Sequence, residues 1–210
     1  MHSPVQTETL NWRSYPKDPG LSQVLAASLV VFHEYGYHGT TVRMIATQAG
    51  MSVPGLYYHF TSKQEILVAL LKQSNEDLMA RAQAALAEAG DSPRERFSAL
   101  VENIILYMTH RRHLAHLARE IKFLEEPYRR AHIARRDELE LMMRREVMAA
   151  QKQGQFLVQD AKEVTRAVWV LCRSVADWYV AKGAKSPAEI ARTYVDYCHA
   201  LVRDTKAGPY

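Results

Sequence analysis

Residues 40 to 63 read TTVRMIATQAGMSVPGLYYHFTSK, and this stretch decides the fold of the N-terminal part of the chain. After Thr41, whose residue type caps helix N-termini, apolar residues recur at helical spacing as far as position 49. Gly50 can take the left-handed backbone that ends a helix. Ser52 can cap the next helix, and Pro54 falls in its first turn, where a missing amide is harmless. The stretch therefore predicts two short helices joined by a glycine turn.

The side chains outside the apolar face of these helices suit DNA. A helix in the major groove needs small residues for close approach and polar groups for phosphates and base edges. Gly55 offers close approach, and Tyr57, Tyr58 and His59 supply hydrogen-bond donors. Arg43 can make a bidentate contact to guanine. The pattern favours a helix-turn-helix, although the same aromatic residues could also belong to the core of an ordinary helical domain.

The longer run TTVRMIATQAGMSVPGLYYHFTSKQEIL resembles the N-terminal signature of the TetR family of transcriptional regulators. The helix expected from Leu25 to Phe32 fits as well, and the resemblance covers about residues 21 to 70. It implies phosphate contacts from Thr41, Tyr57, His59 and Lys63. It implies positions at or near base edges for Arg43, Ser52, Pro54, Gly55 and Tyr58. Val53 differs from the pattern expected for a base-reading helix, because it is apolar where a polar side chain would read bases.

The resemblance and the helical periodicity together predict an all-α fold. We expect an N-terminal three-helix helix-turn-helix DNA-binding domain over residues 21–65 and a C-terminal helical ligand-binding and dimerisation domain over 66–210. Residues 1–20 are polar and contain three prolines, which is typical of a flexible arm. Trp12, Arg13 and Lys17 could reach a minor groove from such an arm.

The chain after Lys63 is expected to be helical almost throughout. The pattern predicts a long helix to about Gly90, one capped by Asp91 or Ser92, a short one ended by Pro127, and one that runs to about Gly154. Two final helices carry regular apolar stripes with steps of three and four. TetR-like proteins usually dimerise through such a pair, so the resemblance implies a homodimer interface over about residues 160–205.

The helices between these two ends are expected to enclose a small hydrophobic effector. The candidate ligand-binding residues are polar, aromatic or flexible side chains on otherwise apolar faces: Tyr107, His116, Arg119, Met142, Arg173 and Trp178. A buried guanidinium needs an anionic or carbonyl partner. Asp177, four residues after Arg173, would make that guanidinium inert if the two pair.

The C-terminal part also resembles the ligand domains of acyl-CoA-responsive TetR regulators. This resemblance lies in Arg135 to Asp160, including Gln153-Gly154-Gln155-Phe156, and in Trp178-Tyr179, Gly183 and Ser186 to Ile190. Residues 111 to 152 contain eleven basic and seven acidic side chains, which suits the phosphates of coenzyme A. Acyl-CoA is therefore one candidate effector.

The charge of the chain indicates how it must bind DNA. The whole chain carries +4, but residues 21 to 63 contain only Arg43 and Lys63 against Glu34. Phosphate neutralisation supplies much of the affinity for DNA, so one such module binds weakly. A dimer on a palindromic double-stranded operator offsets this weakness. We expect a repressor that an effector releases by tilting the long helix. A constitutive DNA-binding regulator without a ligand is the alternative.

Other functional classes find little support in the sequence. No signal peptide or membrane-spanning run is apparent, so a cytoplasmic protein without a membrane partner is expected. Cys172 and Cys198 lie inside apolar helical patterns and are expected to be packed thiols. No residue spacing suggests a metal site or a cofactor. An enzyme is not expected, and its nearest candidate is the trio His110, His113 and His116.

Overall fold

The computed structural model describes residues 10–203, and these residues form helices and no strands. This confirms the all-α prediction. The helices are α1 Gln23–Gly39, α2 Val42–Gln48, α3 Val53–His59, α4 Lys63–Glu88, α5 Pro93–His110, α6 Arg112–His116, the 3₁₀ helix η1 Leu117–Phe123, α7 Glu126–Lys152, α8 Ala161–Arg173, α9 Val175–Trp178 and α10 Pro187–Leu201.

The two short helices α2 and α3 begin and end as the sequence predicts. The Thr41 hydroxyl accepts a hydrogen bond from the Met44 amide at 3.2 Å, and the Ser52 hydroxyl accepts one from the Gly55 amide at 3.2 Å. Gly50 joins the helices with a φ of +64°, a backbone conformation that costs other residues steric strain. These signals are local, because each capping bond joins residues only three positions apart.

Two hydrophobic clusters form the core, and α4 belongs to both. The N-terminal cluster joins α1, α2 and α3 to the first half of α4, up to Leu71, and to Leu114 and Leu117. The C-terminal cluster begins on α4 at Leu78 and gathers residues from α5, α7, α8 and α10. The expected domain boundary at residues 65 and 66 thus falls inside one continuous helix. Any tilt of α4 must therefore move the two clusters relative to each other.

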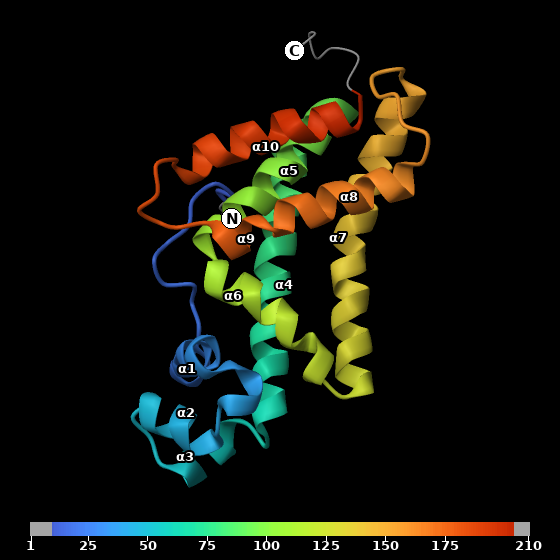
Figure 1. Ribbon diagram of the computed structural model, residues 1–210. Coiled ribbons are helices and arrows are strands. Elements are labelled where there is room, and N and C mark those ends of the chain that lie inside the picture. The colour runs from blue at the N-terminus through green and yellow to red at the C-terminus, as the bar shows by residue number, and fades with distance from the viewer. Residues whose placement is uncertain (1–9, 204–210) are drawn as a thin grey trace, which may run out of the picture.

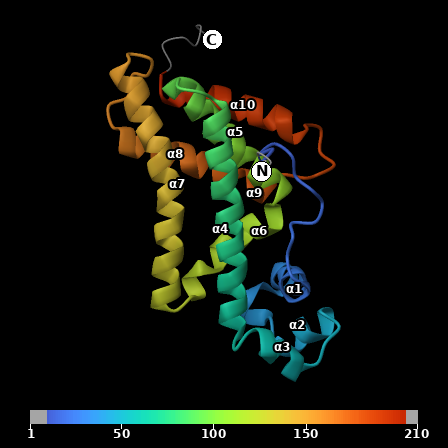
Figure 2. The same cartoon turned by 180° about the vertical axis from the view of Figure 1, so that it is seen from behind.

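The helices are arranged around α4 and α5 (Figure 1). In both views α4 runs along the molecule, with α1, α2 and α3 at one end and α8 and α10 crossing at the other (Figure 2). The α7 helix lies beside α4 and packs against it and α5. Most side chains of α5 are buried, so α5 is the central helix of the C-terminal cluster.

The segment before α1 differs from the flexible arm that its composition predicts. Residues 10–20, which we call the N-terminal strap, run along the C-terminal cluster down to α1 (Figure 1). Trp12 is only 1% exposed and packs within this cluster. Arg13 forms ion pairs with Glu88 and Glu102 instead of pointing toward DNA. Polar composition misled the prediction because one large aromatic side chain anchors the segment. Residues 1–9 of the expected arm lie outside the described residues.

Two helix ends also differ from their predicted positions. Pro127 lies in the first turn of α7 and so begins a helix that it was expected to follow. The apolar stripe from 164 to 178 is not one helix, because α8 ends at Arg173 and α9 starts again at Val175. The break removes the i,i+4 geometry that would have paired Arg173 with Asp177.

The two cysteines pack as predicted. Cys172 of α8 and Cys198 of α10 are fully buried, with their sulfur atoms 3.9 Å apart. Within residues 10–203, no helix combines the length and the apolar character needed to cross a membrane.

Candidate DNA interface and effector pocket

The exposed face of α2 and α3 carries the residues predicted to contact DNA. Leu56 points inward and is fully buried, so α3 presents the opposite side to solvent. Tyr58 is 87% exposed, and its ring meets the His59 ring edge-on with centroids 5.5 Å apart. Tyr57 and Arg43 are also exposed. Figure 1 shows α2 and α3 at the end of the molecule that lies away from α8 and α10. The face is accessible to a large, rigid partner.

The remaining predicted DNA contacts lie around the same two helices. Thr41, Ser52 and Pro54 are exposed at the starts of α2 and α3, and Gly55 is half-buried. The hydroxyls of Thr41 and Ser52 each accept one capping hydrogen bond from a backbone amide. Each hydroxyl keeps its own hydrogen, which it can donate to a phosphate.

Lys63 is used differently from the free phosphate-binding cation that the sequence suggests. Its ammonium group donates to the carbonyls of Tyr37 at 2.6 Å and Thr40 at 2.7 Å. The nitrogen also lies 4.3 Å from the centroid of the Tyr37 ring. Burial lowers the pKa of Lys63. An ammonium has three donors, so one remains for a phosphate while two fasten α4 to the end of α1.

A pocket opens between α4, α5, α7 and α8 in the C-terminal cluster. The space between its lining side chains amounts to about 620 Å³, including the part open to solvent. Its apolar lining comes from Leu71, Leu78, Met79, Met108, Ala115, Ala118, Ile121, Leu139 and Trp169. Its polar lining comes from Ser74, Asn75, Tyr107, His132, Arg135, Arg136 and Arg173. An apolar body with a few convergent polar groups is typical of small-molecule sites.

The polar groups on the α4 side of the pocket form hydrogen bonds with α5 and α7. The Tyr107 hydroxyl, buried with its residue only 1% exposed, donates to the Ser74 carbonyl at 3.0 Å and lies 2.9 Å from the Ser74 hydroxyl. Burial raises the pKa of Tyr107, so this phenol stays neutral. The Asn75 amide lies 3.0 Å from Nδ1 of His132, which accepts from it in the neutral imidazole.

The α7 and α8 side of the pocket carries three arginines, and the described lining contains no carboxylate. Arg135, Arg136 and Arg173 all line the pocket. Arg173 makes no hydrogen bond or ion pair within residues 10–203, and its guanidinium lies 6.0 Å from the Trp169 ring. Burial, and then the neighbouring Arg136, lower the pKa of Arg173. Arg135 lies 3.9 Å from Glu76 and Arg136 lies 2.7 Å from Asp137, two carboxylates outside the lining. Arg173 has no such partner in the described residues, which favours an anionic group beside it in the pocket.

The six predicted ligand-binding residues divide between two places. Tyr107 and Arg173 line the pocket. His116 and Arg119 instead contact the carboxylate of Asp177, His116 with Nε2 at 3.4 Å. Trp178 is half-exposed and stacks near Tyr194, with ring centroids 6.2 Å apart. Met142 packs against the C-terminal cluster and is not part of the pocket lining.

Sequence reasoning did not name His132, Arg135 or Arg136 as ligand-binding residues, although both arginines belong to the basic excess of residues 111 to 152 that it matched to coenzyme A phosphates. Together with Leu139 they follow the three- and four-residue steps of one face of α7. That spacing was visible in the sequence, but the run of basic residues around it looks like a solvated helix face.

The three histidines of the alternative enzyme hypothesis do not converge on one point. The His110 ring stacks on Tyr15 at 4.6 Å, and the His113 ring stacks on His33 of α1 at 4.1 Å. His116 faces Asp177. His110 and His113 are exposed and His116 is half-buried, and each ring contacts a neighbouring segment. No group of three or more His, Cys, Asp or Glu with metal-binding geometry occurs within residues 10–203.

His132 should make the stability of the protein pH-dependent. Burial, followed by the charges of Arg136, Arg173 and Arg135, lowers the pKa of His132 to about 4. The unfolded chain takes up a proton near pH 6.5, whereas the folded chain does not do so until about pH 4. The free energy of unfolding should therefore fall as the pH drops through this window.

Urea denaturation at pH 7, 5.5 and 4.5 measures this effect. We expect His132→Gln, which cannot titrate, to lose part of the pH dependence of the wild type. His110, His113 and His116 remain in both proteins and serve as the internal control. Identical pH dependence in the two proteins would contradict the assignment.

Comparisons with known proteins agree with this arrangement. The family model described as "Bacterial regulatory proteins, tetR family" matches residues 24–70. The model described as "Tetracyclin repressor-like, C-terminal domain" matches residues 90–202, more than half of the chain. HTH-type transcriptional activator FasR of Mycolicibacterium smegmatis is 35% identical over 112 residues, which are 53% of this chain and 51% of FasR. The matched segment therefore spans about half the length of that relative.

Solved structures share the fold over nearly the whole chain. The TetR family regulator PfmR of Thermus thermophilus is 28% identical with a TM-score of 0.76, covering 89% of this chain and 100% of PfmR. AibR, solved in complex with isovaleryl coenzyme A and operator DNA, is 21% identical with a TM-score of 0.74, covering 86% of this chain and 97% of AibR. Both matched models and both structures describe one architecture, and the chain belongs to the TetR family of DNA-binding transcriptional regulators.

Proposed function

We propose that the chain works as a homodimer that binds a palindromic operator and is released from it by an effector with an anionic group and an apolar body. The observation that carries this proposal is the pocket, where three arginines and a buried histidine face apolar side chains without a carboxylate in the described lining. An acyl-CoA joins these two chemical properties in one molecule. The AibR complex supports this class because that relative was solved with isovaleryl coenzyme A and operator DNA.

The DNA-binding part of the proposal assigns the phosphate and base contacts to the exposed face of α2 and α3. The residues concerned are Thr41, Arg43, Ser52, Pro54, Gly55, Tyr57, Tyr58, His59 and Lys63. Support comes from the exposure of this face and from the match of residues 24–70 to the family model. In a dimer the two copies of α3 would lie in successive major grooves, about 34–36 Å apart.

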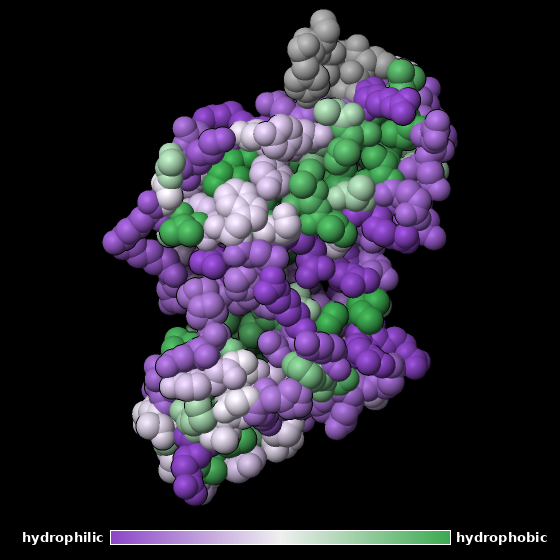
Figure 3. Space-filling model, in the orientation of Figure 1, coloured by the Kyte–Doolittle hydropathy of each residue, from purple (hydrophilic) through white to green (hydrophobic). Residues whose placement is uncertain are grey.

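The dimer interface is proposed on α8 and α10, within the C-terminal domain that follows α4. Apolar side chains gather over these helices in the space-filling view (Figure 3). Val170 of α8 is 62% exposed, and Tyr197 and Leu201 of α10 are also exposed. Together with Trp178 and Val180 they form the main group of exposed large apolar residues at that end of the molecule. Burial of this group against a second copy would remove its apolar surface from water.

The switch is proposed to act through α4. The helix carries pocket residues such as Ser74 and Leu78 and also packs against α1. An effector that occupies the pocket would favour an orientation of α4 that changes the separation of the two recognition helices. It can do so only to the extent that it binds this orientation more tightly than the operator-bound one. We propose repression with release; FasR is named an activator, so the effect on transcription is a separate question.

Charge reversal in the apolar interface tests the dimeric operator complex. We expect Val170→Asp to be monomeric in sedimentation velocity, because two buried carboxylates would face each other across the two-fold axis. Its affinity for DNA enriched by the wild type from a random library should fall by about 10²-fold or more, since the second module no longer binds in the same complex.

Leu141→Asp is the matched control for this variant. It places the same charge on another exposed apolar residue, on α7. It should stay dimeric and bind DNA as the wild type does. A Val170→Asp protein that stays dimeric, or a monomer that binds DNA with wild-type affinity, would contradict the proposal.

A further inference from the structure

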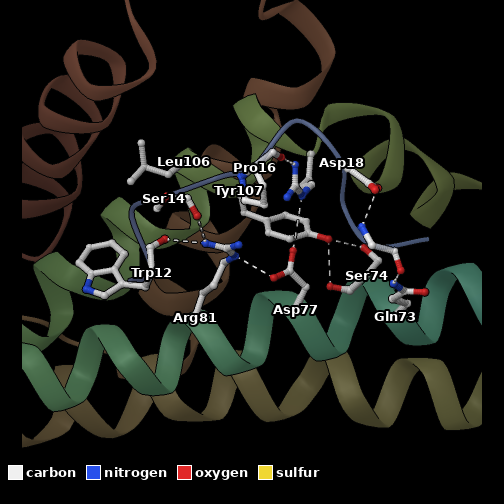
Figure 4. A network of polar contacts seen from close by, with 12 residues as sticks. Trp12, Ser14, Pro16, Asp18, Gln73, Ser74, Asp77, Arg81, Leu106 and Tyr107 are labelled. Atoms are coloured by element: carbon white, nitrogen blue, oxygen red, sulfur yellow. Dashed lines mark hydrogen bonds and ion pairs between the residues drawn. The ribbon is translucent and has the colours of Figure 1, made fainter. Parts of the chain in front are cut away.

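The N-terminal strap is held by buried charged groups as well as by packing. Arg81 of α4, only 4% exposed, donates to the carbonyls of Trp12 at 3.0 Å and Ser14 at 2.8 Å (Figure 4). Its Nε atom donates to Asp77 at 2.7 Å, and its guanidinium lies 3.8 Å from the centroid of the Tyr15 ring. A buried guanidinium devoted to two backbone carbonyls fixes the path of the segment at that point.

The strap also bridges α4 and α5. Arg13 forms ion pairs with Glu88, the last residue of α4, and with Glu102 of α5. Arg111, directly after α5, donates to the Pro16 carbonyl at 2.9 Å and lies 3.6 Å from Asp77. The strap therefore contacts both helices along its length and connects α4 to α5.

The anchors of the strap share one face of α4 with the polar wall of the pocket. Ser74, Asp77 and Arg81 follow each other at three and four residues, and Figure 4 shows them pointing to the same side of the helix. Ser74 holds the pocket residue Tyr107, Arg81 holds the strap, and Asp77 pairs with Arg81. A displacement of α4 relative to α5 at the pocket must therefore change the contacts of the strap.

The other end of the strap leads directly into the DNA-binding domain. Gln73 of α4 donates to the Gly20 carbonyl at 3.2 Å, and Ser22 caps α1 two residues later. Within α1, Gln23 then donates to the Ala49 carbonyl at the end of α2 at 2.7 Å. The chain thus passes from the C-terminal cluster to the helix-turn-helix with few residues free of contacts.

We propose that the strap is a second mechanical connection between the effector domain and the helix-turn-helix, and that it transmits movements of α4 to α1. A domain joined only through α4 could turn about that helix, whereas a domain attached at both ends of its chain follows α4 as a unit. The packing of Leu114 and Leu117 in the N-terminal cluster and the stacking of His33 on His113 also join the domains, and the strap adds a connection that continues into α1 along the chain. The direction of the signal rests on the proposed function; the connection itself does not.

Hydrogen exchange of the effector-free protein, followed by mass spectrometry, tests this connection without DNA or ligand. The first variant lacks residues 1–16 and so loses every strap contact of Trp12, Arg13, Ser14, Tyr15 and Pro16. We expect amides of residues 24–59, which take part in none of the strap contacts described above for these five residues, to exchange roughly tenfold faster than in the wild type, as expected when a charged hydrogen bond no longer supports a local structure.

A second variant keeps the test decisive if the shortened chain fails to fold. Arg81→Lys in the full chain keeps the positive charge beside Asp77, but an ammonium cannot reproduce the planar fork that holds the strap. It should show the same pattern of faster exchange to a smaller extent. Lys17→Ala is the control, because Lys17 is an exposed strap residue whose loss leaves all these anchors in place.

The result that would overturn the proposal is faster exchange confined to the residues that the strap touches, about 77 to 111, with unchanged protection of residues 24–59. A wild type that binds neither DNA nor any effector would contradict the proposed function but leave this measurement intact. The two failures can therefore be told apart.

Discussion

Replacing Arg43 by alanine should weaken binding to the selected operator by about 5- to 150-fold, the effect of one lost bidentate base contact. Arg43 is the only lysine or arginine between residues 40 and 62, so no neighbouring cation can take its place. The slope of log K against log salt concentration should also fall by about 1. Fluorescence anisotropy of labelled operator at several salt concentrations measures both quantities.

Two further variants give this prediction its controls. Tyr58→Phe keeps the exposed ring and removes only the hydroxyl, so a smaller loss of affinity identifies a hydrogen bond to DNA. Arg145→Ala removes the same charge from an exposed position on α7, away from α2 and α3, and should leave binding unchanged. If Arg43→Ala and Tyr58→Phe both bind with the affinity and salt dependence of the wild type, the assignment of the DNA contacts to the exposed face of α2 and α3 is wrong.

Replacing Arg173 by methionine should abolish most effector binding and at the same time stabilise the effector-free protein. Truncation of one partner of a buried charge pair costs about 2–5 kcal/mol, so affinity for an anionic effector should fall by about 30-fold or more. Without effector, Arg173 lies half-buried near Arg136 with no ion pair in the described residues. An apolar side chain of similar size there should raise the free energy of unfolding, by about 1 kcal/mol or more.

Arg144→Met is the matched control for this pair of effects. Arg144 is a half-buried arginine on α7 whose guanidinium lies 2.6 Å from the Glu140 carboxylate. Since this substitution removes one partner of an existing ion pair and lies outside the pocket, it should not stabilise the protein or change effector binding. Calorimetric titration with acyl-CoAs and urea denaturation measure the two properties. A destabilised Arg173→Met protein that still binds effector would show that Arg173 serves the fold.

The parts of the structure that sequence predicted well are those set by local chemistry. The caps at Thr41 and Ser52 and the turn at Gly50 depend on residues no more than a few positions apart, so they can be recognised in the chain itself. The same holds for the start of α5 at Ser92. The exposed face of α3 could also be predicted, because Leu56 is the one buried residue of this helix.

The parts that sequence missed depend on contacts between distant segments. The strap looked flexible because nothing in residues 10–20 reveals that Arg81 and Arg111, some 70 and 95 residues later, hold its carbonyls. The basic excess of residues 111 to 152 was noticed, but the spacing alone does not show which of its arginines line the pocket. Asp177 was assigned to the wrong arginine because the break at Ser174 turns it toward Arg119.

The central claim is that one molecule couples operator binding to an anionic effector with an apolar body. The most direct measurement is the anisotropy of labelled operator bound to the wild type during titration with isovaleryl-CoA, palmitoyl-CoA and free coenzyme A. We expect at least one acyl-CoA to release the operator at concentrations that saturate the protein in calorimetry, and Arg173→Met to keep the operator bound. If no acyl-CoA binds the protein and none changes operator affinity, the chain is a constitutive regulator or responds to another class of ligand, and the claim fails.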